Sequence, residues 1–179
     1  MKGIVFTELI EMVEQQFGYE TVDQLLVETN LPSGGAYTAI GTYSHQEMVD
    51  LINGLSLKTG IAVPTLLHRF GQYLFKTFVR VYGHFFEHLT DTFSFLSAVH
   101  HHIHVEVKRL YPDAELPDFE IEKIDGKTMK MVYHSARRMG DLAEGLLMAS
   151  IAHFNENTRV ERRNLDEDGK VVCFLITKN

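Results

Sequence analysis

The sequence predicts an α+β fold, with helices in the first part of the chain and an antiparallel sheet of about four strands in the second. Three observations predict it. Apolar residues recur at helical spacings up to about residue 110, strand-like alternation and Asp-Gly turns follow, and one apolar helical segment separates the strands. Helices followed by strands around one helix are typical of this class. The length of 179 residues suits a single domain.

The first predicted helix covers residues 3–17. Phe6, Leu9 and Val13 repeat there at spacings of three or four, and Gly18 provides a stop.

Two capping-box patterns predict where the next helices begin. Thr21 with Gln24 would open a short helix, and Ser44 with Glu47 would open a longer one that ends at Gly60. The stretch between these helices is rich in Pro, Ser and Gly, which predicts a loop.

Two further helices are predicted before the strands. Residues 64–81 have little polar face, so this helix is expected to lie centrally. Residues 93–111 carry one apolar stripe and are expected to form a single long helix, which ends where Tyr111 precedes Pro112.

The strands are predicted as two hairpins, which turn at the Asp-Gly pairs beginning at Asp125 and Asp168. Residues 128–137 alternate in the way an extended strand does. Residues 141–154 return to helical spacing between the hairpins.

The composition excludes several classes of protein. The net charge of −7 argues against a broadly basic nucleic-acid surface. The single cysteine excludes an internal disulfide and a multi-cysteine zinc site. The first residues lack the pattern of a signal peptide, and no apolar run is long enough for a membrane span. A reduced, cytoplasmic setting is therefore expected, with neither nucleic acid nor membrane as a partner.

Four of the ten histidines, His100, His101, His102 and His104, fall in one predicted helix. His100 and His104 share a helix face, and neutral imidazole binds zinc, copper, nickel or heme iron. The same cluster could instead be a solvated surface or an adventitious metal site. No HExxH motif supports a zinc peptidase.

Tyr133, Ser135 and Arg137 are predicted to share one face of a strand, spaced by roughly 6.5–7 Å per two residues. Arginine binds a carboxylate through two parallel hydrogen bonds, and each hydroxyl can donate one more. The arrangement suits a ligand with two carboxylates. An ordinary polar strand edge would look the same.

His104, Pro117 and the Tyr133-x-Ser135-x-Arg137 motif together resemble the signature of the heme nitric-oxide/oxygen binding (H-NOX) family, which includes the heme domain of soluble guanylate cyclase. The twelve residues between His104 and Pro117 match the family spacing, and the other clustered histidines do not fit it. The resemblance spans essentially the whole chain, including the segments Met1-Lys2-Gly3 and Gly71…Lys76-Thr77-Phe78.

The resemblance implies heme b (iron protoporphyrin IX), held between a helical subdomain (1–62) and a heme-ligating, sheet-containing part (63–179). His104 would be the axial ligand to iron. Tyr133, Ser135 and Arg137 would bind the propionates. Three residues would pack on the porphyrin: Val5, Phe78 and Pro117.

On the opposite side of the heme, Leu142 stands where oxygen-binding relatives have a tyrosine in an Asp-Tyr-x-x-Gly context, and the supporting positions are Leu9 and Leu74. Tyr73 should point about 100° away from its neighbour Leu74 and miss the pocket. Oxygen gains about 1.5–3 kcal/mol from a charge-assisted hydrogen bond, which nitric oxide needs less. The resemblance therefore implies selectivity for nitric oxide over oxygen, with carbon monoxide a further possible ligand.

The resemblance also implies a sensor rather than an enzyme. Nitric oxide binding to ferrous heme would weaken the iron–His104 bond. The resulting conformational change would regulate a separate signalling partner, such as a histidine kinase or a cyclic-di-GMP enzyme.

Three alternatives remain open at this point. The chain could be an oxygen-binding heme sensor on the same fold, or a heme-free protein that holds a transition metal with the His100–His104 cluster. For an enzyme, only His134 and Cys173 are candidates by residue type, and both are predicted to be structural.

Overall fold

The computed structural model describes residues 1–179 and has the predicted α+β architecture. The strands are β1 (Asp118–Lys123), β2 (Thr128–His134), β3 (Thr158–Asn164) and β4 (Val171–Lys178). The helices are α1 (Gly3–Phe17), α2 (Tyr19–Glu28), α3 (His45–Thr59), α4 (Val63–Val81), the 3₁₀ turn η1 (Gly83–Phe85), α5 (Thr92–Ala98), the π-helical segment η2 (Val99–Ile103), α6 (His104–Leu110) and α7 (Gly140–His153).

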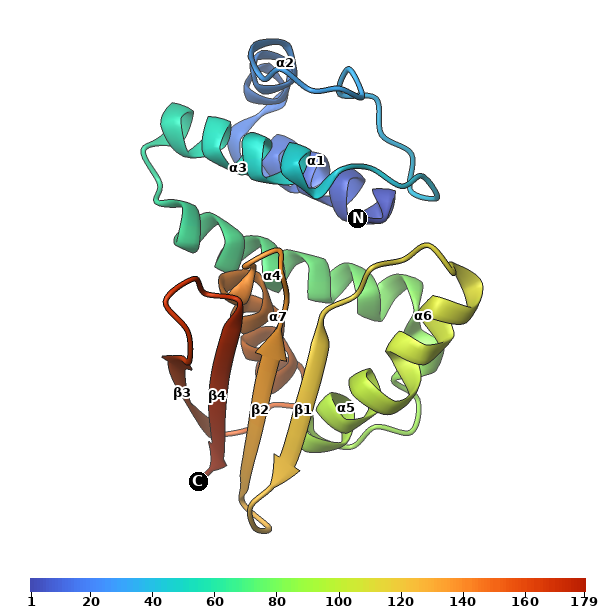
Figure 1. Ribbon diagram of the computed structural model, residues 1–179, viewed down its shortest axis with the longest axis vertical. Helices are drawn as coiled ribbons and strands as arrows, with labels where there is room; N and C mark the ends of the chain where they lie inside the picture. The colour runs from blue at the N-terminus through green and yellow to red at the C-terminus, as the bar shows by residue number, and fades with distance from the viewer.

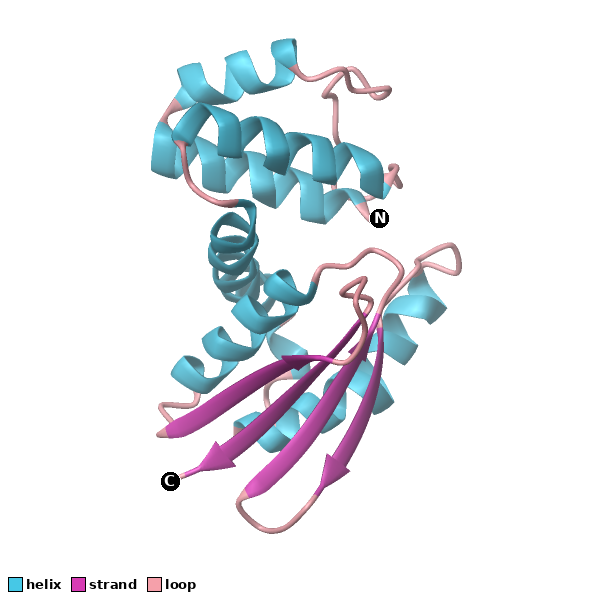
Figure 2. Ribbon diagram, turned by 60° about the vertical axis from the view of Figure 1, so that its left-hand side comes forward, coloured by secondary structure: helices cyan, strands magenta, loops and turns pink.

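The elements form two layers with α4 between them (Figures 1 and 2). Helices α1–α3 lie together at one end, and the sheet lies at the other. The four strands are antiparallel in the order β1-β2-β4-β3, and both hairpins form as predicted. None of the helices combines the length and the hydropathy that crossing a membrane requires.

Helix α4 belongs to two hydrophobic cores. Phe70 and Leu74 pack with α1–α3, while Phe75 packs with α5, α7 and the sheet. The central place predicted for residues 64–81 is confirmed, because apolar side chains surround this helix on more than one face.

Helices α4 and α7 touch through their backbones. A Cβ atom added at Gly145 would lie 2.1 Å from the carbonyl oxygen of His68 and 3.0 Å from Cα of Gly71. Such a close approach is possible only because both crossing positions are glycine.

One predicted helix start is wrong. Helix α2 begins at Tyr19 rather than at Thr21. Gly18 directly before it has a φ of 87°, which interrupts the helical conformation between α1 and α2. The Thr21 hydroxyl donates to the Phe17 carbonyl at 2.8 Å, so it is not free to cap a helix.

The predicted start of α3 is right, but its capping box is incomplete. Ser44 accepts from the backbone N–H of Gln46, and Gly60 ends the helix with φ 71°. Glu47 turns away from the cap. It accepts from the Tyr37 hydroxyl at 2.9 Å and from the hydroxyl of Ser33. This buried carboxylate fastens the loop of residues 30–43 onto α3.

The start of α5 is fixed by an ion-pair cluster. Lys178 donates to Asp91 at 2.7 Å and lies 2.6 Å from Glu156. Asp91 is also the N-cap of α5 and accepts from the backbone N–H of Ser94. Burial opposes ionisation of Asp91, but these hydrogen bonds outweigh it and lower its pKa from 3.8 to about 2.

We expect Asp91→Asn to lower Tm at pH 7 by about 2–4 °C, because asparagine keeps the cap but loses the ion pair. The folded-state pKa lies below the unfolded one, so the contribution is complete above pH 3.8 and disappears as pH falls towards about 2. Thermal unfolding of the wild type and the variant should show that their difference in Tm becomes smaller as the pH falls from 7 to 3. Asp168→Asn, which removes an exposed pair with Lys170, is the control and should change Tm little.

Candidate functional site

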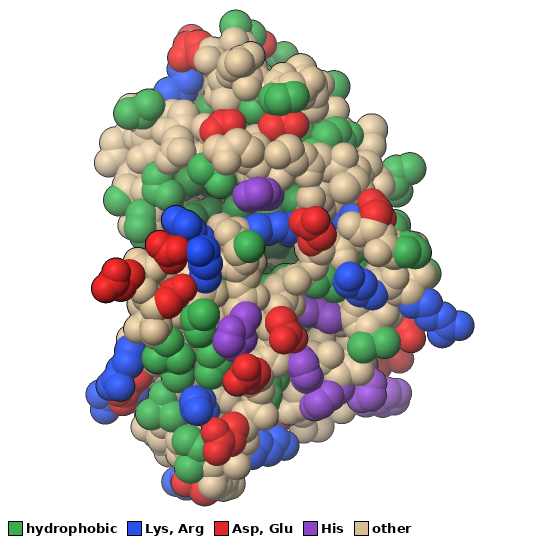
Figure 3. Space-filling model, in the orientation of Figure 1, with side chains coloured by type: hydrophobic (Ala, Val, Ile, Leu, Met, Phe, Trp, Pro, Cys, Tyr) green, Lys and Arg blue, Asp and Glu red, His purple; other side chains and the backbone are tan.

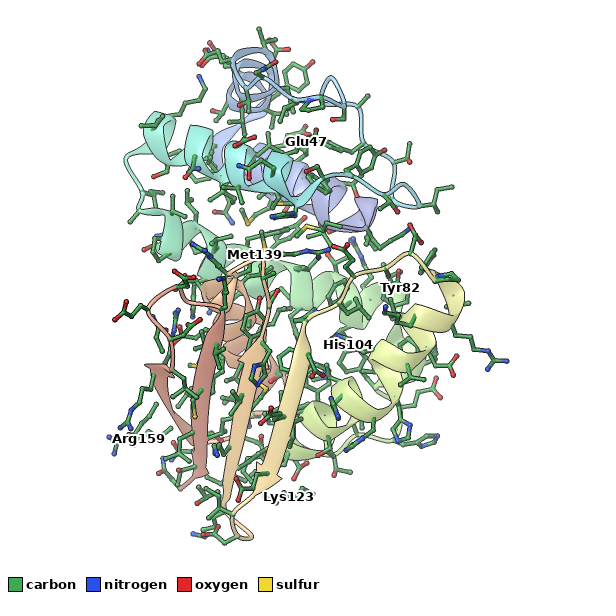
Figure 4. All side chains as sticks on the ribbon, viewed as in Figure 1. Glu47, Tyr82, His104, Lys123, Met139 and Arg159 are labelled. Atoms are coloured by element: carbon green, nitrogen blue, oxygen red, sulfur yellow. The ribbon has the colours of Figure 1, made fainter.

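A cavity of about 390 Å³ lies between the start of α1, the C-terminal half of α4, the α5–α6 segment, α7 and the β1–β2 edge. Hydrophobic side chains provide 26 of its 33 lining residues. An apolar cavity with a few polar groups at defined places is the usual form of a cofactor site. Figure 4 shows His104, Tyr82 and Met139, which reach it from three different segments.

The helix predicted over residues 93–111 is divided. The π-helical segment Val99–Ile103 separates α5 from α6, and His104 is the first residue after it. π-Helical turns are rare and frequently mark functional sites. Ile103, His104 and Val107 all line the cavity, so the divided helix still presents its apolar stripe to it.

Of the four clustered histidines, only His104 lines the cavity. His101 and His102 are exposed, and Nδ1 of His100 lies 3.9 Å from an Asp118 oxygen. Histidines gather on the face formed by the sheet edge and the α5–α6 segment (Figure 3). No three His, Cys, Asp or Glu side chains converge there as a metal ion would require. The geometry therefore gives the heme-free metal alternative no support.

His104 is held as a neutral imidazole. Burial, followed by the charge of His100, lowers its pKa from 6.5 to about 4, and hydrogen bonding to the Pro117 backbone only partly opposes this. Its ring lies 5.6 Å from that of Phe119. A neutral imidazole is the form in which histidine ligates a metal.

The strand expected over residues 128–137 is shorter than predicted. Strand β2 ends at His134, and the next residues form a turn in which the Ser135 hydroxyl accepts from the Arg137 backbone N–H at 3.2 Å. Serine commonly stabilises turns in this way. The strand spacing expected for the three motif residues is therefore wrong beyond Tyr133.

The turn nevertheless brings Tyr133, Ser135 and Arg137 to the same cavity. Tyr133 is 3% exposed, and its oxygen accepts from the Met139 N–H at 3.3 Å. Burial raises the pKa of Tyr133, so the phenol keeps its proton for donation. The end of β2 and the turn after it thus bring two hydroxyls and a guanidinium to one cavity, an arrangement that suits an acidic group.

Arg137 already has a carboxylate partner. Its Nη2 donates to Oε2 of Glu115 at 2.9 Å, and both residues line the cavity. Glu115 lies in the segment between α6 and β1. No motif in the sequence singled it out, because the contact joins residues 22 positions apart through the fold.

Five of the predicted apolar pocket residues line the cavity: Val5, Leu74, Phe78, Pro117 and Leu142. Leu9 does not. It is fully buried in the hydrophobic core, one helical turn beyond Val5 on the same face of α1. Tyr73 is also absent from the lining, as its angular offset from Leu74 predicted.

Tyr82 lines the cavity and was missed by the sequence analysis. It follows Phe78 by four residues, and the two rings lie 6.1 Å apart. Helical spacing from Leu74 through Phe78 was therefore the signal that could have found it. Burial, with the nearby phenol of Tyr111, raises the pKa of Tyr82.

The two enzyme candidates lie outside the cavity. Nε2 of His134 is 3.1 Å from a Glu120 oxygen, and Cys173 pairs with Val132 across the sheet.

The family model and the similar solved structures all point to one protein family. The family model HNOB, described as Haem-NO-binding, matches residues 2–162. The Fe(II) unliganded H-NOX protein from K. algicida is 38% identical with a TM-score of 0.95, over 100% of this chain and 97% of that one. An H-NOX protein from S. oneidensis in the Fe(II)NO ligation state is 25% identical with a TM-score of 0.92, over 100% and 99% of the two chains.

A third similar structure is the H-NOX from Shewanella woodyi in the Fe(II)CO ligation state, solved with IWP-051 bound. It is 38% identical with a TM-score of 0.86, over 100% of this chain and 95% of that one. No curated protein matches the chain.

Proposed function

The chain belongs to the Haem-NO-binding (H-NOX) family, and from this premise we propose that it is a heme-based sensor that prefers nitric oxide to oxygen and controls a separate signalling protein. The observation that carries the proposal is an apolar cavity whose lining includes His104 together with Tyr133, Ser135 and Arg137. These residues fit heme b, which presents a metal ion and two carboxylates. The bound iron would supply the site at which the gas binds.

Different residues of this chain would bind the metal, the carboxylates and the ring of the heme. The imidazole of His104 would ligate the metal, since it lines the cavity and burial keeps it neutral. Tyr133, Ser135 and Arg137 would hold the carboxylates. Val5, Phe78 and Pro117 would pack against the ring faces, because they belong to the apolar lining.

The preference for nitric oxide rests on Leu74 and Leu142. Both line the cavity and neither can donate a hydrogen bond. A donor there would favour oxygen by about 1.5–3 kcal/mol, as charge-assisted bonds do. Leu9 supports the apolar wall indirectly, because it packs in the core behind it rather than in the cavity.

The signal would begin at His104. This residue is the first of α6 and directly follows the π-helical segment, so a change in its position is passed to the whole α5–α6 arm. The two conformational states would differ in whether His104 is bound to the iron. A two-state switch requires such a difference in interaction between its states. A signalling partner such as a histidine kinase or a cyclic-di-GMP enzyme would read the change, and the chain itself would have no catalytic role.

The first test is the absorption spectrum of the reduced protein alone, in air and with nitric oxide. A heme band that shifts with nitric oxide but not in air supports the proposal. A band that also shifts reversibly in air would make the chain an oxygen sensor. No heme band after hemin is supplied would overturn the heme assignment.

Arg137→Ala is expected to weaken heme retention by roughly 10- to 100-fold, because a charge-assisted pair of hydrogen bonds is lost. Heme occupancy and the rate of heme transfer to apomyoglobin would measure the effect. Arg159→Ala, which removes an exposed arginine paired with Glu161 on β3, is the control and should retain heme like the wild type. Equal retention in both variants would contradict a role for Arg137.

A further inference from the structure

We infer that Glu115 competes with the acid groups of the ligand for Arg137, and so limits how fast and how tightly the chain takes up an acidic porphyrin. The inference rests on the proposed heme site and adds a residue outside its motif. In the ligand-free chain, Glu115 would accept the Arg137 hydrogen bond that a carboxylate of the ligand would otherwise accept.

The two partners of this ion pair differ greatly in exposure. The Arg137 side chain is 14% exposed, whereas that of Glu115 is 82% exposed. Arg137 is therefore the fixed member, held in the turn that Ser135 stabilises. Glu115 reaches the guanidinium from the solvent side and can leave it without opening the core.

The exchange replaces one carboxylate with another of the same geometry. Glu115 occupies the Nη2 donor of Arg137 at 2.9 Å, so an incoming acid group that binds the same donor has to displace Glu115. Because the Glu115 carboxylate remains largely in solvent, a ligand with its own apolar contacts can displace it from Arg137.

The segment that carries Glu115 is fastened independently of it. Thr42 donates to Asp113 at 2.6 Å, and Lys2 lies 3.7 Å from the same carboxylate. Pro117, two residues further on, contacts His104 through its backbone. Removing the charge of Glu115 should therefore free Arg137 without releasing this segment.

The experiment measures hemin uptake by the heme-free protein in stopped flow and by titration. We expect Glu115→Gln to increase the association rate constant and the affinity by roughly two- to fivefold relative to wild type. Glu122→Gln removes the same charge from an exposed pair with Lys130, away from the cavity, and should leave both values unchanged.

Two further arms separate competition from a general charge effect. The gain of Glu115→Gln should disappear with hemin dimethyl ester, which lacks the acid groups, and in an Arg137→Ala background. A gain that persists in either arm, or no gain with hemin, would overturn the inference while leaving the heme site intact. Failure of the wild type to bind either porphyrin would instead overturn the proposed function.

Discussion

His104→Gly is expected to lose most of its heme on purification, and added imidazole should restore the wild-type absorption spectrum of the reduced protein. The reason is that the variant removes the only clustered histidine that lines the cavity and leaves a space into which free imidazole fits. In the same variant, the response of a signalling partner to nitric oxide should be lost even when imidazole is present, because the ligand is no longer joined to α6.

His102→Gly is the matched control for this experiment. It places glycine two residues earlier in the same helical arm, at roughly the same cost of about 1 kcal/mol in helix stability, but at an exposed position. It should keep heme and the partner response. An unchanged spectrum in His104→Gly without imidazole would show that another residue holds the metal.

The second large effect is expected from Gly145→Ala, which should lower the free energy of unfolding by roughly 1–3 kcal/mol and Tm by about 3–10 °C. The new Cβ would lie 2.1 Å from the His68 carbonyl oxygen, so α4 and α7 must move apart. Both helices line the cavity, and we therefore expect weaker heme retention as well. Thermal unfolding and heme occupancy would measure the two effects.

Gly54→Ala is the appropriate comparison, since Gly54 also lies within a helix. Its added Cβ would meet only the end of the Leu25 side chain at 2.9 Å and the Thr29 hydroxyl at 3.2 Å, and the leucine can rotate away. This variant should be neutral or slightly more stable, because alanine favours the helix. A similar loss of stability in both variants would argue against a special role for the α4–α7 crossing.

The order of helices and strands could be predicted because it depends on apolar periodicity, which the sequence shows directly. Gly18 and Gly60 end helices where expected, since their positive φ angles suit glycine. The start of α2 was misplaced because Thr21 bonds back to Phe17, which the pattern of residue types does not reveal.

Most of the site residues that the sequence predicted line the cavity, but the sequence could not predict the local backbone geometry that brings them there. Neither the π-helical segment before His104 nor the end of β2 at His134 has a periodic signature, because both depend on local hydrogen bonds and packing. Glu115 meets Arg137 only in the folded chain. Helical spacing placed Leu9 on the apolar face of α1 but could not say whether that part of the face meets the cavity or the core.

The shared position of α4 has a consequence for how the chain can be divided. Phe70 and Leu74 complete one core and Phe75 the other, so neither half has a finished interior without this helix. A fragment that begins at residue 63 would expose Phe70 and Leu74 to water and is expected to aggregate. A fragment that ends at residue 62 would lack the α4 side chains that complete its core. In chimeras of related proteins, α4 should therefore come from the same parent as the residues that it packs against in both cores.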